Sequence, residues 1–391
     1  MPGILSYHPS NVFIRSVFIA ATLAVSCATE DRNLPDANLD TDNASVTRAA
    51  RFSLEKTDSC TILKITDPWQ GAEGIVQVYY LVNRNNKISF GSGESSVIHV
   101  PLKKIICMST THLAMVSALD EEDAVVGVSG AGFVYDESIL SKIHMGLIYD
   151  VGYESGINNE LIISLRPDLI MMYGIGSESA GYLGKVKELG INVMFNADYL
   201  ETDPLGKAEW IKVFGALFCR EKMADSIFRS VSESYDTIKS FISRSISERP
   251  DVLLGLPFRD TWFISPGDSY ASRFIEDAGG NYLWSDTKSS VSMPYGLEDV
   301  FRRSLKADYW LNTGNASSKR VITSLDPRLE TIPCFSTGNI YNNNRRISQA
   351  GGNDYWESGI LNPHLILKDI AAILHPELFP DYELFYYRRI E

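Results

Sequence analysis

The sequence predicts an α/β protein with two Rossmann-like lobes joined by a long backbone α-helix, and with an added N-terminal β element. Three observations lead to this fold class. Short apolar runs alternate with helical segments in two regions of the chain; a stretch of helical periodicity without proline, between Pro204 and Pro250, separates them; and two motifs occur in the same order in both. A weak internal repeat around one helix indicates two similar lobes that face each other across a cleft.

The composition is that of an ordinary globular protein, and its charge argues against one class of function. The 391 residues allow two or three compact units. The chain has 36 Lys and Arg against 49 Asp and Glu, which gives a formal charge of -13. Because phosphate recognition depends on clustered Lys and Arg, we do not expect a nucleic-acid-binding protein.

Residues 1–27 are predicted to be a signal peptide with a lipobox. Arg15 precedes an apolar run, residues 16–26, which is as long as a signal-peptide core and too short to cross a bilayer. The small residues before Cys27 resemble a bacterial lipobox, in which the cysteine is lipidated. We therefore expect an exported protein that is lipidated at Cys27 and anchored to a membrane. The alternatives are a plain secretory signal with an incidental cysteine, and a misassigned start.

The next segment, residues 28–50, is predicted to be a flexible tether. It is rich in Asp, Asn, Thr and Ala and poor in large apolar side chains, so it cannot bury enough surface to fold. No later segment reaches 18 consecutive apolar residues, so the lipid alone would hold the protein at the membrane.

The β element and the first lobe follow in order. Residues 51–100 contain two β-rich runs, 61–66 and 75–82, separated by turn residues, which predicts antiparallel strands. Residues 101–204 form the predicted N-terminal α/β lobe, because short apolar runs alternate there with helical segments, as in βαβ units. Its predicted strands are 104–108, 124–128, 168–172 and 191–195.

Connecting helices are predicted over residues 205–247 and the C-terminal α/β lobe over 248–391. The second of these helices, residues 222–245, would be on the order of 35 Å long at 1.5 Å per residue, enough to bridge two lobes. The predicted strands of the second lobe are 252–256, 262–264, 307–311 and 339–341.

The two lobes share a pattern of helix starts and strands. Residues 109–112 and 265–269 each open a helix that leads to a short strand. Glu160 is followed by Asp168 and a strand, and Glu298 is followed by Asp308 and a strand, with two extra residues in the second copy.

These motifs resemble the periplasmic binding proteins that carry iron siderophores, haem and vitamin B12. The segment Glu160-Leu-Ile-Ile-Ser-Leu-Arg-Pro-Asp168, preceded by Gly152 and Asn158-Asn159, is similar to the first-lobe signature of that family, and Asp277-Ala-Gly-Gly-Asn281 to the second. Residues 204–210 and 351–357 look like its Bacteroidetes branch. The resemblance covers residue 101 to the C-terminus and implies two α/β lobes on a rigid helix that close only slightly on a ligand.

The resemblance also implies a role for two glutamates. In this family the surface glutamate of each lobe docks an arginine pair on the membrane permease, and Glu160 and Glu298 occupy the matching positions. Exposed charges at matched points would orient the encounter. The alternative is that each is only an N-terminal helix carboxylate favoured by the helix dipole.

Ligand contacts are expected from loops at the carboxyl ends of the strands, where open parallel sheets leave a crevice. Aromatic rings there suit a large planar or amphiphilic chelate, and Arg345 with Arg346 could meet an anionic one. Half-buried packing is the alternative for each aromatic residue, and a helix-start hydrogen bond for His112. The candidate ligand-binding residues are Thr110, His112, Tyr135, Tyr153, Tyr173, Trp262, Tyr270, Trp284, Arg345 and Trp356.

No cofactor and no protein-only metal site are expected, because the six histidines form neither an HExxH motif nor a close pair. A zinc- or manganese-binding relative would need several converging ligands, and only His112 and His144 lie on suitable loops. Disulfide pairing stays open among Cys60, Cys107, Cys219 and Cys334.

We therefore predict a binding protein without enzymatic activity: a monomer whose partners are a small-molecule metal chelate, an inner-membrane ABC permease and, through its lipid, the membrane. The alternatives are an exported α/β hydrolase or carbohydrate-active enzyme, and a surface lipoprotein that binds a partner. The chain has no GxSxG, GxxxxGK[ST] or HExxH motif. The partner-binding alternative would require a large exposed apolar patch on residues 51–100.

Overall fold

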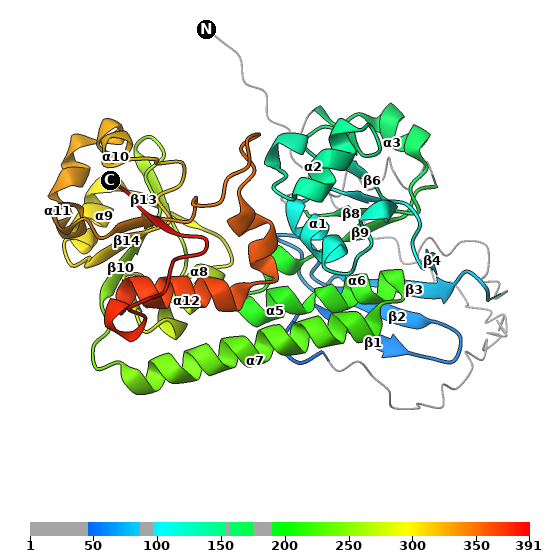
Figure 1. Cartoon of the computed structure of the whole chain (residues 1–391), viewed down its shortest axis with the longest axis horizontal. Coiled ribbons are helices and arrows are strands. Elements are labelled where there is room, and N and C mark those ends of the chain that lie inside the picture. Colours follow the sequence, from blue (N-terminus) through cyan, green and yellow to red (C-terminus); the bar gives the residue numbers. More distant parts are fainter. Residues whose placement is uncertain (1–45, 87–96, 154–155, 175–189) are drawn as a thin grey trace, which may run out of the picture. The chain divides into compact units, whose positions relative to one another are not determined.

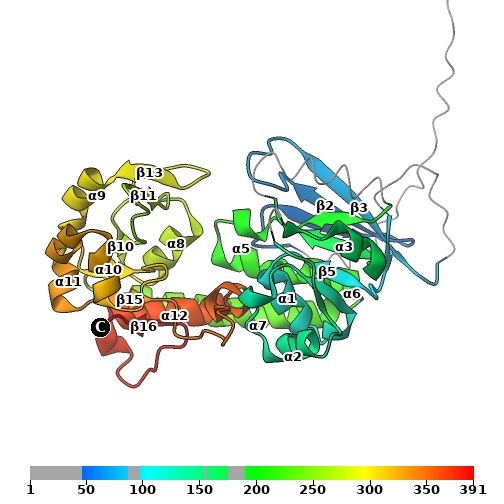
Figure 2. The same cartoon turned by 90° about the horizontal axis from the view of Figure 1, so that it is seen from above.

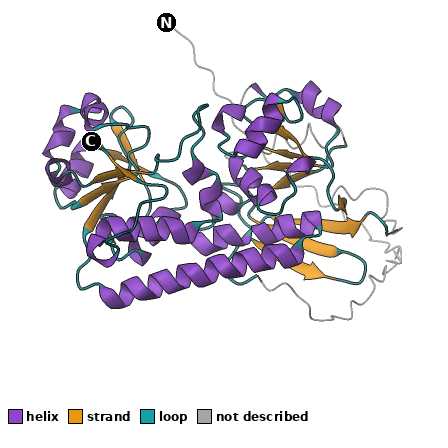
Figure 3. Ribbon diagram, viewed as in Figure 1, coloured by secondary structure: helices purple, strands orange, loops and turns teal. Residues whose placement is uncertain are grey.

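The computed structural model describes residues 46–86, 97–153, 156–174 and 190–391, all of which belong to one compact unit. The predicted signal peptide, Cys27 and most of the predicted tether lie outside the described residues. The described part contains two mostly parallel α/β sheets and a separate four-stranded β sheet (Figures 1 and 3). The predicted α/β fold class is therefore confirmed.

The N-terminal β element is a four-stranded sheet in the order β1-β2-β3-β4. Its first three strands are antiparallel, as predicted, and β4 is parallel to β3. Leu63 and Ile65 are fully buried in the same apolar cluster as the N-terminal lobe, whereas Lys64 between them is exposed. The strands are β1 Phe52–Lys56, β2 Thr61–Thr66, β3 Val76–Asn83 and β4 Val97–Val100.

The N-terminal lobe is a parallel sheet in the order β7-β6-β5-β8-β9. The runs predicted as strands form β5, β6, β8 and β9, and their side chains are almost all buried, as in a sheet covered on both faces. The strands are β5 Ile105–Cys107, β6 Val125–Val128, β7 Tyr149–Asp150, β8 Leu169–Met172 and β9 Val193–Phe195; the helices are α1 Thr110–Ser117, α2 Glu137–His144 and α3 Asn159–Leu165.

Three consecutive helices lead from this lobe to the next: α5 Pro204–Glu209, α6 Ile211–Phe218 and α7 Glu221–Ser245. The predicted long helix is α7, whose buried stripe includes Phe228, Val231 and Tyr235. It packs against α6 at one end and against α8 and α12 of the C-terminal lobe at the other (Figure 1). Among the described residues, no helix combines the length and apolar character needed to span a membrane.

The C-terminal lobe is a sheet in the order β12-β10-β14-β15-β16, parallel except for β16, and β11 pairs with β13 in a separate antiparallel ribbon. Its strands are β10 Asp251–Leu254, β11 Thr261–Ile264, β12 Asn281–Tyr282, β13 Met293–Gly296, β14 Tyr309–Leu311, β15 Ile340–Asn342 and β16 Arg388–Arg389. Its helices are α8 Tyr270–Asp277, α9 Leu297–Ser304, α10 Lys319–Leu325, α11 Pro333–Thr337 and α12 Pro363–Leu374.

The internal repeat appears in the structure as matched helix starts. Ser109 caps α1 and Ser269 caps α8, and each hydroxyl accepts a backbone N–H of the first turn. In both sheets the first strand, β5 or β10, lies between the next strand of the same sheet, β6 or β12, and the strand after the glutamate-bearing helix, β8 or β14.

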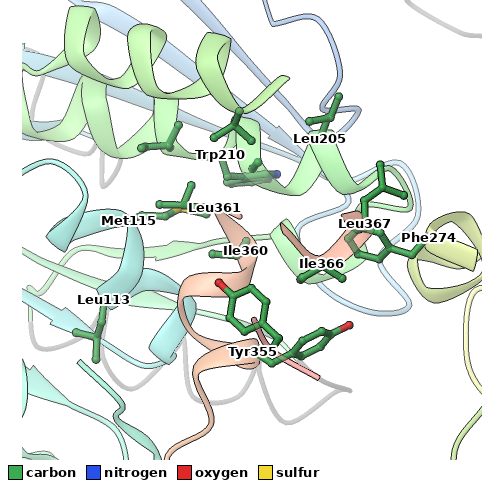
Figure 4. Packing of buried hydrophobic residues seen from close by; sticks show 14 of the residues in the cluster. Leu113, Met115, Leu205, Trp210, Phe274, Tyr355, Ile360, Leu361, Ile366 and Leu367 are labelled. Carbon is green, nitrogen blue, oxygen red and sulfur yellow. The ribbon is translucent and has the colours of Figure 1, made fainter. Parts of the chain in front are cut away.

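One apolar cluster joins the lobes at their base. It includes Leu113 and Met115 of α1, Trp210 between α5 and α6, and Ile366 and Leu367 of α12; Figure 4 shows these side chains spread along the junction. Burial of this cluster removes large apolar side chains of both lobes from water, and so favours a fixed junction.

The start of the described chain is held on two buried carboxylates. Glu209 accepts the backbone N–H groups of Thr47, Arg48 and Ala49 at 2.7–3.1 Å, and Glu201 accepts those of Ala50 and Arg51 at 3.0–3.1 Å. Residues 47–50, which the sequence assigned to the tether, therefore lie fixed beside α5.

Tyr235 gives a test of how α7 is attached to the C-terminal lobe. Its buried hydroxyl donates to Asp277 of α8 at 2.8 Å. We expect Tyr235→Phe to lower the free energy of unfolding by about 1.5–3 kcal/mol, because a hydrogen bond to a charged group is lost. Urea denaturation measures this change. Tyr149→Phe, at a ring that is 45% exposed, is the control, and an equal effect in both variants would contradict the assignment.

Candidate functional site

A crossover segment, residues 343–357, runs from the end of β15 to the N-terminal lobe. Ser348 Oγ donates to the carbonyl of Val134 at 3.0 Å, and Thr110 Oγ1 lies 3.5 Å from the carbonyl of Trp356. Gly352 permits the approach, since a Cβ there would lie 2.3 Å from the Val134 carbonyl oxygen. The segment thus packs beside loops that follow β5 and β6.

Glu357 is the main polar link between the crossover segment and this lobe. It is 2% exposed, and its carboxylate accepts the backbone N–H groups of Tyr135 at 2.8 Å and Asp136 at 2.7 Å. Burial raises the pKa of Glu357 to about 7; these two N–H donors oppose the shift, and the neighbouring carboxylates of Asp136 and Asp354 add to it.

A cleft of about 720 Å³ lies between the lobes. Its walls are residues 199–202, which follow β9 of the first lobe, and residues 265–271, which follow β11 of the second. Figure 2 shows α8 and α5, which flank these walls, facing each other. The remaining lining residues are Arg51, residues 69–73 of the β2–β3 loop, residues 289–292 and Trp356. Its volume lies within the ordinary range for small-molecule sites.

Buried charge lies beside this cleft. The Lys207 ammonium stands 4.2 Å from the centre of the Tyr270 ring, which lines the cleft. Burial lowers the pKa of Lys207, and the nearby carboxylates of Asp198 and Glu201 oppose that shift. Burial raises the pKa of Asp198 to about 6, with Lys207 acting in the opposite sense. The cation therefore lies next to the cleft with compensating carboxylates around it.

Two predicted ligand-binding residues, Tyr270 and Trp356, line the cleft. Trp356 is 58% exposed, which leaves its ring open to a ligand. Thr110 lies against the Trp356 backbone. Tyr173 is half-buried with its ring 6.4 Å from that of Tyr199, a cleft residue. These four residues lie in or close to one site.

Tyr135 and Arg346 line a different cavity of about 450 Å³, between α1, α7 and the crossover segment. The Arg346 guanidinium bonds Asp354 at 2.5 Å and lies over the rings of Tyr135 and Phe385. Arg345 pairs instead with Glu383. Both arginines therefore already have protein partners, and neither lines the larger cleft.

Three predictions of ligand contact are wrong because the side chains are buried. His112 is fully buried beside Phe214, and burial lowers its pKa to about 3, so its ring stays neutral. Trp262 is fully buried, donates to the Leu254 carbonyl and packs on Trp310. Trp284 is 1% exposed. These side chains belong to the cores of the lobes.

Tyr153 and the two predicted docking residues lie on the surface. Tyr153 is 41% exposed and packs against Phe133. Glu160 and Glu298 are both exposed at the second residue of their helices, α3 and α9, and Glu298 is ion-paired with Arg328. Their matched places agree with the internal repeat, while docking itself stays a prediction.

Sequence reasoning missed Trp69, Tyr199 and residues 289–292 as cleft residues. Trp69 was placed in a turn of an element outside the repeat, and nothing local indicated which lobe that turn would meet. Tyr199 follows the predicted strand 191–195, so its position at a carboxyl end could have drawn attention to it.

Four cysteines lie in the part of the chain that the structure describes. Cys60, Cys107, Cys219 and Cys334 are free thiols. Within the described ranges, no group of three or more His, Cys, Asp or Glu side chains is arranged to hold a metal ion.

The sequence of the chain matches the model of a known protein family. The model of the periplasmic binding protein family matches residues 105–343. A lipoprotein of uncharacterised function from Methanocaldococcus jannaschii is 29% identical over 318 residues, covering 78% of this chain and 73% of that protein. A second lipoprotein from the same organism is 26% identical over 334 residues, 82% of each chain.

Solved structures share the fold. A protein of an ABC-type Fe3+-hydroxamate transport system from Saccharomonospora viridis matches with a TM-score of 0.56 at 18% identity, covering 80% of this chain and 98% of the other. A periplasmic haem-binding protein from Pseudomonas aeruginosa matches with a TM-score of 0.56 at 15% identity, covering 74% and 98%.

The raised pKa of Glu357 predicts a pH-dependent contribution to stability. Since the folded state raises this pKa from 4.5 to about 7, it binds the proton more tightly than the unfolded state. The contribution is complete below pH 4.5 and is lost as the pH rises through 7; it amounts to as much as about 3 kcal/mol.

Urea denaturation at pH 4.5 and pH 7.5 measures this contribution. We expect the free energy of unfolding of the wild type to fall more across the interval than that of Glu357→Gln, which cannot titrate there. The control is Glu137→Gln, at an exposed glutamate of α2, which should follow the wild type. Parallel pH profiles for the wild type and Glu357→Gln would contradict the assignment.

Proposed function

Because the chain belongs to the periplasmic binding protein family, we propose that it is the substrate-binding lipoprotein of an ABC importer. It captures an iron chelate (a siderophore or haem) or cobalamin and delivers it to the inner-membrane permease. The observation that carries this proposal is the cleft between the lobes, to which both lobes contribute loops at the carboxyl ends of strands.

The chemistry of the cleft supports a large chelate as its occupant. Trp69, Tyr199, Tyr270 and Trp356 supply aromatic surface, and several serines of residues 265–271 and 289–292 supply hydroxyl groups. Aromatic rings offer contact area at low entropic cost, and hydroxyl groups can both donate and accept hydrogen bonds. Such a lining suits a ligand with apolar faces and polar edges.

The connection between the lobes supports capture with little movement. Helix α7 packs against both lobes, and Glu357 adds a second, polar link. A largely preformed cleft spends little free energy on reorganisation when it binds. Free and bound forms are therefore expected to differ little.

Delivery rests on the lipid anchor and the two glutamates. Two relatives from Methanocaldococcus jannaschii are described as lipoproteins, which supports an anchor at Cys27. Residues 47–51, bound to Glu209 and Glu201, would be the point where the tether meets the folded body. Glu160 and Glu298 would then meet basic residues of the permease, one from each lobe.

Ligand titration tests the proposed function. The protein from Ala28 onward is titrated with cyanocobalamin, haemin and two ferric siderophores, and Trp fluorescence is followed. We expect saturable one-to-one quenching by one of them at submicromolar concentration. Trp356→Ala should weaken that binding by about tenfold or more, because an exposed anchor ring is lost. Phe258→Ala, at another exposed ring (64%) outside the cleft lining, should bind as the wild type does; silence from all four ligands would refute the proposal.

Permease docking is tested by charge reversal. We expect the double variant Glu160→Lys/Glu298→Lys to bind its chelate normally but to lose most transport in proteoliposomes that hold the cognate permease, because two rim charges would repel the basic docking residues. Glu137→Lys reverses an exposed glutamate at the start of a neighbouring helix and is the control. Equal transport by the double variant and the control would contradict the docking role and leave the two glutamates as carboxylates that only stabilise the N-termini of their helices.

A further inference from the structure

The β2–β3 loop, residues 67–75, brings an added element to the cleft. The family model begins at residue 105, so the whole N-terminal β element lies outside the matched region. Five consecutive residues of this loop, 69–73, nevertheless line the cleft. The loop therefore forms a wall that the matched region of the family does not supply.

The β2–β3 loop is firmly attached to the N-terminal lobe. The backbone N–H of Gln70 lies 3.1 Å from the carbonyl of Gly174, just after β8, and 3.0 Å from the hydroxyl of Tyr199, just after β9. The Trp69 ring stands 5.3 Å from that of Phe195, the last residue of β9. Tyr79 of β3 adds a hydrogen bond to the Val193 carbonyl at 3.2 Å.

Close packing fixes the position of this wall. A Cβ at Gly174 would lie 2.5 Å from the Cβ of Trp69, so glycine is required for the two segments to meet. The loop also turns on Gly71 and Gly74, both with positive φ angles, 85° and 69°. A wall held by hydrogen bonds, ring packing and backbone contact is pre-organised for binding.

The loop also adds negative charge to the cleft. Glu73 is exposed and lines the cleft, as does Asp268 on the opposite wall. Within the described part of the chain, neither carboxylate takes part in an ion pair. The Arg51 side chain, also in the lining, donates instead to the carbonyls of Leu200 and Asp67. Asp268 accepts the backbone N–H of Ser289 at 3.3 Å, so a polyanion would meet two carboxylates that have no ion-pair partner among the described residues.

We propose that the β2–β3 loop is a specificity-determining wall of the cleft, and that Glu73 with Asp268 makes the protein select an uncharged or cationic metal chelate over a polyanionic one. The ligand class is then a hydroxamate-type ferric complex or a corrinoid, as opposed to haem with its two propionates or a ferric tris-catecholate. Trp69 supplies a ring for the face of the ligand, and Glu73 supplies the charge preference. This inference rests on the proposed function.

Competition between ligands of different charge is the first test. The wild type is titrated with the cationic ferric complex of desferrioxamine B, neutral cyanocobalamin, haemin and a ferric tris-catecholate. We expect one of the first two to bind at least about tenfold more tightly than either polyanion, because the exposed carboxylates of Glu73 and Asp268 repel an anionic ligand. Preference for a polyanion would overturn the inference and leave the proposed function standing.

Variants of the loop are the second test, and their affinities are measured with the same four probes. Glu73→Lys should shift the ratio of affinities for the ferric desferrioxamine B complex and haemin by about three- to tenfold toward haemin, and added salt should reduce this shift. Trp69→Ala should weaken binding of the tightest probe by about tenfold. Because Trp69 also packs on Phe195, circular dichroism checks whether Trp69→Ala still folds. Glu73→Lys changes an exposed residue, so its result does not depend on that packing.

Asp58→Lys is the matched control, since Asp58 is also exposed and lies in the β1–β2 turn of the same element, outside the cleft lining. It should leave the affinity ratio unchanged. A ratio that is the same in Glu73→Lys, Asp58→Lys and the wild type would overturn the role of the loop, although chelate binding itself remained. No binding of any chelate by the wild type would overturn the proposed function and this inference with it.

Discussion

Buried carboxylates that accept backbone N–H groups hold together segments far apart in the sequence. Glu209 and Glu201 bind residues 47–51, and Glu357 binds the loop at 135–136. Asp369 of α12 accepts the N–H groups of residues 385–387 at 2.6–3.1 Å. A buried carboxylate is costly unless such donors surround it, so each one specifies its partner segment. The N-terminal segment, the crossover segment and the C-terminal strand depend on these contacts for their positions.

Burial raises the pKa of each of these carboxylates and hydrogen-bond donors lower it, and which effect is larger differs from one carboxylate to the next. Burial alone would raise the pKa of Glu209, but N–H donors of residues 47–49 and Lys212 bring it below the ordinary value. For Glu201 and Asp369 burial outweighs the donors, and the pKa is raised. Glu357 has two backbone donors and two neighbouring carboxylates, and its pKa rises to about 7. The link between the crossover segment and the first lobe therefore depends on a carboxyl group with a pKa near neutral pH.

The sequence allowed the scaffold to be predicted because the scaffold follows local patterns. Buried parallel strands appear as short apolar runs, and α7 follows its stripe of apolar residues to within one residue of the predicted start. The burial of His112 could have been predicted from the sequence, since His112 shares a helix face with the apolar residues Met115 and Val116, three and four positions later. The burial of Trp262 could not have been predicted, because Trp262, Phe263 and Ile264 are all apolar and only the fold decides that Phe263 is the exposed one. The wall made by residues 69–73 required tertiary contacts that no local pattern records.

The segments outside the repeat account for much of the ligand specificity that we infer for the cleft. The cleft walls follow β9 of the N-terminal sheet and β11 of the antiparallel ribbon in the C-terminal lobe, and a scaffold of this kind accepts many ligands. Here the crossover segment occupies the space beside the loops after β5 and β6, and the β2–β3 loop covers the ends of β8 and β9. Both additions lie outside the repeated motifs, and both leave open the cleft between residues 199–202 and 265–271. The shape and charge of that cleft are thus set in part by segments that belong to neither parallel sheet, so ligand preference can differ between proteins that share the scaffold.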